Sequence, residues 1–182
     1  MWIEVVIPFD ENNRLAGAYN RALRQGKSGW VLFLDHDVFL CNPNWYTICL
    51  RAIENLKNDP KAALITCVAG GQRHHQIVRT GAVINDSIGD HILIAKDLYS
   101  KWGNTLKRTD DQLAGFFFLL NRHIAKNIGF RQINSTINGI DADFCSRLYG
   151  AGYHAYELPG LYVYHRRGMK RLKKEFVPSI QT

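Results

Sequence analysis

Two carboxylates flank a histidine inside an otherwise apolar run, WVLFLDHDVFLCNP, which begins at Trp30. If the strand-like part of the run extends up to the first aspartate, Asp35 and Asp37 project from the same side of the chain, about 6 to 7 Å apart, while His36 faces the other way. Two ionised carboxylates at about 6 Å repel by on the order of 3 kcal/mol at an effective dielectric constant near 20. A fold that keeps both needs a cation, hydrogen-bond donors or water beside them, and such oxygen ligands suit Mg²⁺ or Mn²⁺.

A second acidic pair, Asp141 and Asp143, stands at an expected helix start in GIDADFCSRL. Carboxylates at this position commonly cap a helix or complement its dipole. A purely structural interpretation is also open for the first pair, in which one aspartate caps the next segment and the other is simply exposed. Taken singly, neither pattern establishes a function.

The elements that must position these carboxylates alternate between strands and helices. Apolar, β-branched runs separated by helical stripes of ten or more residues are typical of an α/β fold with a parallel sheet covered on both faces. In such sheets ligands bind beyond the carboxyl ends of the strands, where the pair after Trp30 would lie. The patterns predict strands at 3–8, 31–34, 62–68, 116–120 and 161–165, a short strand pair at 77–84, and helices at 15–26, 45–60, 91–103, 122–129 and 141–153.

Composition limits the class of protein. A chain of 182 residues, 46% hydrophobic and 21% charged, is typical of one globular domain, here 1–182. The longest apolar run, AGFFFLL, is far shorter than the roughly 20 residues of a membrane span. The four cysteines form no CxxC pair and have apolar neighbours, which favours buried free thiols over disulfides or a zinc site. We therefore expect a cytoplasmic protein.

The net charge of +7 is partly concentrated in the sequence HRRGMKRLKKEF, and we refer to 166–182 as the basic C-terminal tail. A basic balance favours phosphate-bearing partners, which include nucleic acid, an anionic membrane surface and a nucleotide substrate. A solvated tail without a partner is an equally open interpretation.

Six segments carry a resemblance to a known family: VVIPFDEN, AGAYNRAL, VLFLDHD, AGFFFLLNRHIAKNIGF, GIDADFCSRLYGAGY and LYVYH. In this order they resemble the nucleotide-sugar glycosyltransferases of the GT-A fold, especially the large inverting family 2. The resemblance implies a Rossmann-like, three-layer α/β fold with a mainly parallel central sheet. It also implies transfer of a sugar from a nucleotide-diphosphate donor, with a UDP-sugar expected, to a hydroxyl group of a glycan or glycoconjugate. It leaves peripheral membrane contact through the tail open and implies no specific nucleic-acid partner.

The resemblance assigns roles to the acidic residues. Asp35 and Asp37 match the DxD motif that holds Mn²⁺ or Mg²⁺ against the donor diphosphate, with Asp35 shared between the metal and the ribose. His165 matches a late histidine that completes the metal site in some relatives. Asp141 matches the catalytic base, which accepts the proton of the acceptor hydroxyl.

The resemblance also implies a nucleotide pocket in the first part of the chain. Pro8, Phe9 and Asp10 would line it, with Phe9 near the base and Asp10 near the base or the ribose. Arg14 and Asn20 are further candidates for the same pocket.

Two features depart from the family pattern. The DxD motif comes much earlier than in typical members, so a strand and a helix of the nucleotide-binding half are missing and this half is abbreviated. In addition, Ile140 stands where relatives usually have an acidic residue before the base.

Two other functions remain open at this stage. An apolar strand followed by DxDxV also resembles the first motif of haloacid-dehalogenase-like phosphatases, which use one aspartate as nucleophile and the other as acid and base with Mg²⁺. That family expects the motif on its first strand, whereas here a strand and a helix precede it. The third possibility is a non-catalytic basic binding module, suggested by the charge of +7.

Overall fold

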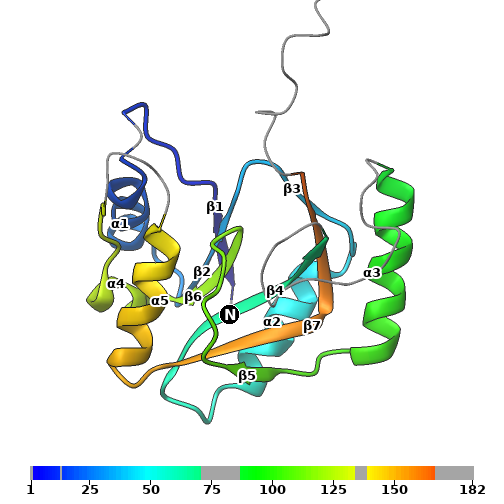
Figure 1. Ribbon diagram of the computed structural model, residues 1–182. Coiled ribbons are helices and arrows are strands. Elements are labelled where there is room, and N and C mark those ends of the chain that lie inside the picture. The colour runs from blue at the N-terminus through cyan, green and yellow to red at the C-terminus, as the bar shows by residue number, and fades with distance from the viewer. Residues whose placement is uncertain (1, 13, 71–86, 134–138, 167–182) are drawn as a thin grey trace, which may run out of the picture.

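The structure is a computed structural model that describes residues 2–12, 14–70, 87–133 and 139–166 (Figure 1). The strands are β1 (Ile3–Val6), β2 (Trp30–Leu34), β3 (Val38–Leu40), β4 (Ala62–Gly70), β5 (Lys107–Thr109), β6 (Phe117–Asn121) and β7 (His154–His165). The helices are α1 (Leu15–Gln25), α2 (Trp45–Asn55), α3 (Ile88–Trp102), α4 (Arg122–Ile128) and α5 (Ile140–Gly150).

All seven strands belong to one sheet in the order β1-β2-β6-β4-β7-β3, and β5 also pairs with β7. The pairings β1–β2 and β4–β7 are parallel, whereas the other four among the described residues are antiparallel. The α/β class is confirmed. The expected mainly parallel sheet is corrected to a mixed one, because β6 lies antiparallel between β2 and β4, and β3 and β5 run antiparallel to β7.

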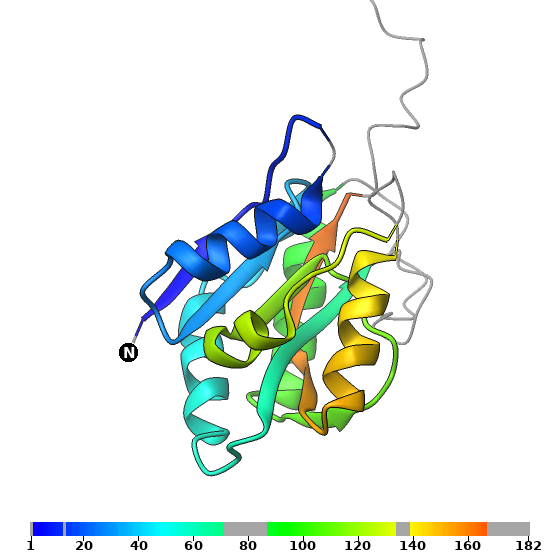
Figure 2. The same cartoon turned by 90° about the vertical axis from the view of Figure 1, so that its left-hand side faces the viewer.

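Helices cover both faces of this sheet, as Figure 2 shows for α1, α4 and α5 on the near face. Along β2, Val31 and Phe33 pack into the cluster beneath these three helices, and Leu32 and Leu34 pack into the cluster with α2. Because successive side chains of a strand point to opposite faces, a strand covered on both sides must be apolar throughout. This explains the uninterrupted run before Asp35 and gives the predicted three layers.

The predicted helices and the strands at 3–8, 31–34, 62–68 and 116–120 are present with shifted ends. β7 begins seven residues before the predicted 161–165. The sequence pattern missed this part because His154, Tyr156 and Glu157 interrupt its apolar residues. The short strands β3 and β5 were not predicted. The strand pair expected at 77–84 and the tail beyond residue 166 lie outside the described residues.

All four cysteines are buried and free, which confirms the prediction. Burial raises the pKa of the Cys49 and Cys145 thiols to about 12, so both stay protonated at neutral pH. Within the described part of the chain, no helix is both long and apolar enough to cross a membrane.

A buried arginine fixes the first strand and helix to the sheet. Arg122 is 7% exposed and donates from Nε to the carbonyl of Ser28 and from Nη1 to the carbonyl of Ala22, at 2.7 Å each. Its Nη2 atom donates to the carboxylate of Glu4 on β1. A Cβ atom at Gly26 would lie 2.2 Å from this guanidinium, so the close approach requires glycine there. The arginine thereby satisfies the last carbonyls of α1 and joins them to β1.

Replacing this cation should destabilise the fold. In Arg122→Met the Glu4 carboxylate and three carbonyls each lose a donor, and we expect a loss of about 3 kcal/mol in the free energy of unfolding. Equilibrium urea denaturation measures this loss. The exposed Arg24 on α1 gives the control, since Arg24→Met should change stability by less than about 0.5 kcal/mol. Equal losses in the two variants would contradict the structural role.

Candidate functional site

The DxD motif lies on a tight turn at the carboxyl end of β2. The backbone N–H of Asp35 donates to the carbonyl of Phe116 at 3.1 Å, and the N–H of Val38 donates back to the carbonyl of Asp35 at 3.3 Å. The chain then enters β3. Asp35 and Asp37 therefore project from a turn and not from an extended strand, and His36 between them is exposed.

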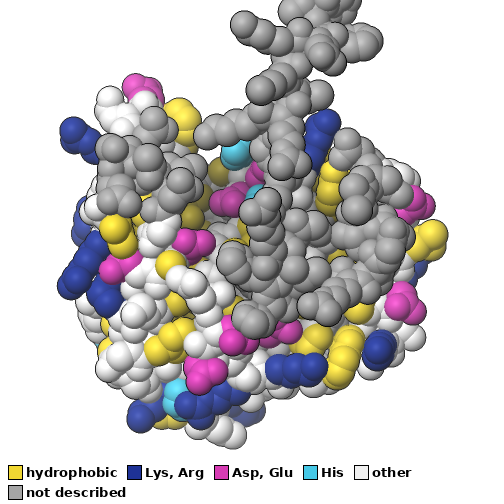
Figure 3. All heavy atoms as spheres, in the orientation of Figure 1, with side chains coloured by type: hydrophobic (Ala, Val, Ile, Leu, Met, Phe, Trp, Pro, Cys, Tyr) yellow, Lys and Arg dark blue, Asp and Glu magenta, His cyan; other side chains and the backbone are white. Residues whose placement is uncertain are grey.

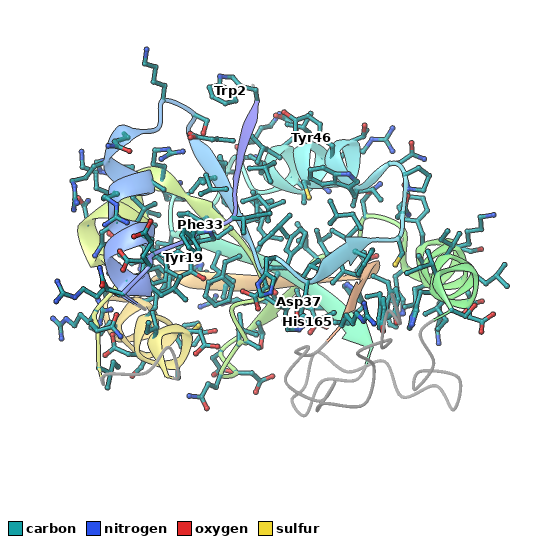
Figure 4. All side chains as sticks on the ribbon, turned by 90° about the horizontal axis from the view of Figure 1, so that it is seen from above. Trp2, Tyr19, Phe33, Asp37, Tyr46 and His165 are labelled. Atoms are coloured by element: carbon teal, nitrogen blue, oxygen red, sulfur yellow. The ribbon has the colours of Figure 1, made fainter. Side chains whose placement is uncertain are left out.

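Pairing of β3 with the end of β7 brings His165 to this turn. Val38 is the register partner of His165, and the N–H of Arg166 donates to the carbonyl of Asp37 at 3.0 Å. The Nε2 atom of His165 consequently lies 3.1 Å from Oδ1 of Asp37 and 3.4 Å from Oδ2 of Asp35. Figure 4 shows Asp37 and His165 next to one another. The structure thus brings together the three residues that the sequence suggested as metal ligands.

The geometry of this Asp35–Asp37–His165 cluster fits a divalent cation. One ligand atom from each side chain lies within 4.8 Å of the others, and no other such cluster of three occurs among the described residues. An octahedral ion with bonds of about 2.1 Å spaces neighbouring ligands by about 3.0 Å and opposite ligands by about 4.2 Å. Two carboxylates and one imidazole suit Mn²⁺. Mg²⁺ is also suited, although it prefers oxygen ligands to nitrogen ligands.

An aromatic ring packs against the cluster, and one of its carboxylates is partly exposed to solvent. The ring of Phe116 stacks on His165 with a centroid distance of 5.4 Å. The side chain of Asp35 is 40% exposed, whereas those of Asp37 and His165 are 18% and 12% exposed. In Figure 3, acidic and histidine side chains gather in the upper middle of the molecule's face. A ligand can therefore approach the cluster from the side of Asp35.

Asp141 lies in the first turn of α5 and is fixed by backbone donors. Its Oδ2 atom accepts the N–H of Gly115 at 3.1 Å, and its Oδ1 atom accepts the N–H of Ala142 at 2.9 Å. A Cβ atom at Gly115 would come within 3.2 Å of the Asp141 Cβ, so glycine permits this close approach. Asp143 behaves differently, because it accepts two hydrogen bonds from Arg147, at 2.8 and 2.6 Å.

Asp35 and Asp141 line the same pocket, which has a volume of about 180 Å³. Its walls also include Tyr19 from α1 and Phe130 from the segment after α4. Sequence reasoning did not assign Tyr19 or Phe130 to the site, because each fits an apolar core position in its own segment. The common pocket is the feature that links the two acidic motifs.

Four of the predicted nucleotide residues, namely Pro8, Phe9, Asp10 and Arg14, lie in the segment between β1 and α1 (Figure 1). Phe9 is 74% exposed, Pro8 is half-buried and Arg14, directly before α1, is exposed. None of the three is among the residues that line the pocket. Their contact with a nucleotide stays a prediction.

Asp10 orders this loop through contacts within the protein. Its Oδ1 atom accepts the N–H groups of Asn12 and Arg14 at 3.0 and 3.1 Å, and its Oδ2 atom accepts a hydrogen bond from Arg21 at 3.1 Å. The hydrogen bond from Arg21 is the main cause that lowers the pKa of Asp10. The carboxylate is therefore ionised at neutral pH and holds the start of α1.

Asn20 also uses its side chain within the protein. Its Nδ2 atom donates to the carbonyl of Phe130 at 2.8 Å, and its Oδ1 atom accepts the N–H of Phe130 at 2.9 Å. This double hydrogen bond ties the segment after α4 to α1 and places Phe130 in the pocket wall. The nucleotide contact that was predicted for Asn20 is not tested by these contacts.

An α/β/α domain with a carboxylate pair at the carboxyl end of β2 is compatible with the GT-A class of fold. The sequence model of Glycosyl transferase family 2 matches residues 5–132, which is 128 of the 182 residues, and the chain belongs to this family. The match includes Asp35 and Asp37 and ends before Asp141 and His165. A comparison with curated proteins finds none that matches the chain.

Membership of the family supports a general statement of function. The family supports glycosyltransferase activity with a nucleotide-sugar donor and a glycan-type acceptor. Its members commonly use divalent metals, and the Asp35–Asp37–His165 cluster offers a place for one.

Removing the Asn20 amide should reveal its structural role. In Asn20→Ala two hydrogen bonds to the Phe130 backbone are lost, and we expect the free energy of unfolding to fall by about 2 kcal/mol without any ligand present. Urea denaturation of the free protein checks this value. The exposed Asn12 serves as the matched control, since Asn12→Ala should leave stability within about 0.5 kcal/mol of the unchanged protein. A stable Asn20→Ala protein would show that the amide is not needed for the fold.

Proposed function

We propose that this protein is a metal-dependent glycosyltransferase that transfers a sugar from a nucleotide-diphosphate donor, expected to be a UDP-sugar, to a hydroxyl group of a glycan acceptor. One observation carries the proposal: Asp35 from the Asp35–Asp37–His165 cluster and Asp141 from α5 line the same pocket. A transferase needs its leaving-group site and its base on opposite sides of the reacting carbon, within one cavity.

The Asp35–Asp37–His165 cluster would hold Mn²⁺ or Mg²⁺. Such an ion, when bound, stabilises negative charge on the departing diphosphate. Two carboxylates from the turn between β2 and β3 and one imidazole from the end of β7 form it, and the pairing of β3 with β7 sets their positions before any ligand arrives. Asp35 belongs to both the cluster and the pocket, and it therefore joins the diphosphate side to the sugar side.

Asp141 is the proposed general base. Each of its oxygens accepts one backbone N–H, and each keeps a further lone pair for a ligand. These bonds hold the carboxylate in place without neutralising it, so it can accept the proton of an acceptor hydroxyl as that oxygen attacks the anomeric carbon. A single displacement assisted by one base inverts the configuration at that carbon.

The two other functions have less support. The DxD motif follows β2, with β1 and α1 before it, whereas the phosphatases that it resembles carry the motif on their first strand. No observation favours a non-catalytic basic module, because Arg166 is the only described residue of the tail. Membrane contact of the tail stays a prediction.

Nucleotide binding should require the metal cluster. We expect UDP with Mn²⁺ to stabilise the protein by about 2.7 kcal/mol at 100 times its Kd, which raises Tm by roughly 5 to 10 °C for a domain of this size. Thermal unfolding with UDP, GDP, CDP and dTDP, each with and without Mn²⁺, measures the effect. In Asp37→Asn the metal-dependent part should disappear.

The exposed Asp97 on α3 provides the control for this experiment, because Asp97→Asn removes the same charge away from the cluster. It should respond to UDP and Mn²⁺ like the unchanged protein. If no nucleotide raises Tm with or without Mn²⁺, the transferase proposal fails. Release of phosphate from small phosphoesters would favour the phosphatase instead.

Loss of the base should affect the chemical step. In Asp141→Asn the amide keeps the shape of the side chain but accepts no proton, so kcat should fall at least about a hundredfold with little change in KM for the donor. Steady-state transfer or hydrolysis of the nucleotide-sugar measures both constants. Asp143→Asn, in the same helical turn, should keep kcat within about threefold and lose stability through Arg147. Equal kcat losses would contradict the assignment of Asp141.

A further inference from the structure

The hydroxyl of Tyr19, at the pocket, has no hydrogen-bond partner among the described residues. Tyr19 is 5% exposed and lines the pocket together with Asp35 and Asp141. Its hydroxyl forms no hydrogen bond with any residue that the structure describes. The ring is buried but the hydroxyl is not enclosed by protein atoms, so a ligand or water in the pocket can accept its hydrogen bond.

The ring that carries this hydroxyl cannot turn away from the pocket. It stacks on Phe130 with a centroid distance of 4.3 Å and meets the edge of Phe33 at 4.7 Å. Phe130 in turn stacks on Phe144 at 4.2 Å and is tied to Asn20 through its backbone. Figure 4 shows Tyr19, which projects from α1, beside Phe33. The phenol is therefore preorganised, and a ligand that uses it incurs little cost in side-chain entropy.

The surroundings keep the phenol protonated. Burial is the main cause that raises the pKa of Tyr19, and the charges of Asp35 and Asp141 raise it further. At neutral pH the hydroxyl is thus a hydrogen-bond donor. Among the described residues that line the pocket it is the one side-chain donor, because the other polar side chains there are carboxylates.

The size and chemistry of the pocket limit what can bind there. A volume of about 180 Å³ is on the scale of one sugar ring. The ligand must donate hydrogen bonds to two carboxylates and accept one from a phenol. A ring that carries several hydroxyl groups meets both needs, since each hydroxyl both donates and accepts.

We propose that Tyr19 is a sugar-binding residue, whose hydroxyl donates a hydrogen bond to an oxygen of the transferred ring while neighbouring hydroxyls of that ring donate to Asp35 and Asp141. The inference rests on the proposed transferase function and adds to it a residue that recognises the transferred sugar. Tyr19 is distinct from the proposed metal ligands and base, because it interacts with the ring and takes no part in proton transfer.

Tyr19→Phe tests the proposal, since it removes one oxygen and keeps both aromatic contacts. Calorimetric titration with Mn²⁺ should give an unchanged Kd for UDP and a Kd about five- to tenfold weaker for the UDP-sugar that binds. The titration uses UDP-glucose, UDP-galactose and UDP-N-acetylglucosamine. Equal affinities of Tyr19→Phe and unchanged protein for every UDP-sugar would overturn the proposal.

Stability separates a ligand-binding role from a structural one. Because the Tyr19 hydroxyl has no protein partner to lose, Tm of ligand-free Tyr19→Phe should equal or exceed that of the unchanged protein. Tyr46→Phe is the matched control. Its hydroxyl accepts the N–H of Ile3 at 3.0 Å, so this variant should lower Tm and keep sugar affinity. A fall in Tm for Tyr19→Phe with unchanged sugar affinity would also overturn the proposal.

A failure of the transferase function gives a different result. In that case the unchanged protein binds neither UDP nor any UDP-sugar, and saturation-transfer NMR with free glucose, galactose and N-acetylglucosamine decides the role of Tyr19. Transfer signals that are present in the unchanged protein and reduced in Tyr19→Phe would support sugar binding at Tyr19. Absence of signals in the unchanged protein would overturn it.

Discussion

The Asp35–Asp37–His165 cluster depends on the antiparallel pairing of β3 with the end of β7. Val38 stands opposite His165, and the N–H of Arg166 donates to the carbonyl of Asp37. The side chains of Asp37 and His165 are thus neighbours because the backbones of these two segments are hydrogen-bonded in register, although the chain between them forms most of the domain. A site built on paired strands keeps its ligand distances more closely than a site built on loops alone.

The segment just before β6 extends this constraint across the pocket. The carbonyl of Phe116 accepts the N–H of Asp35, and its ring stacks on His165. The preceding N–H, from Gly115, holds the Asp141 carboxylate. Two consecutive residues therefore contact both acidic motifs, and the antiparallel direction of β6 places them at the carboxyl end of β2. The separation of the cluster from the proposed base is consequently fixed by the same strand.

The parts of the fold that follow from local patterns could be predicted, and those that depend on distant partners could not. β2 was predicted because covering both faces demands an apolar run. The three-residue β3 has no such pattern, because it exists only through pairing with β7. Asp35, Asp37 and Asp141 were proposed as site residues from residue type and family order. The hydrogen-bond partners of Asn20 and the cavity around Tyr19 depend on residues about a hundred positions away.

The proposed site is preorganised unevenly. Its diphosphate side is held by paired strands, and its sugar side by stacked aromatic rings and the Asp141 contacts. Among the described residues, the side proposed for the nucleoside is the loop after the edge strand β1, in which Ile7 is 57% and Phe9 74% exposed. Ordering an exposed loop around a ligand costs conformational entropy that a fixed wall does not. Contacts to the diphosphate and the sugar are therefore expected to contribute more to donor affinity than contacts to the nucleobase.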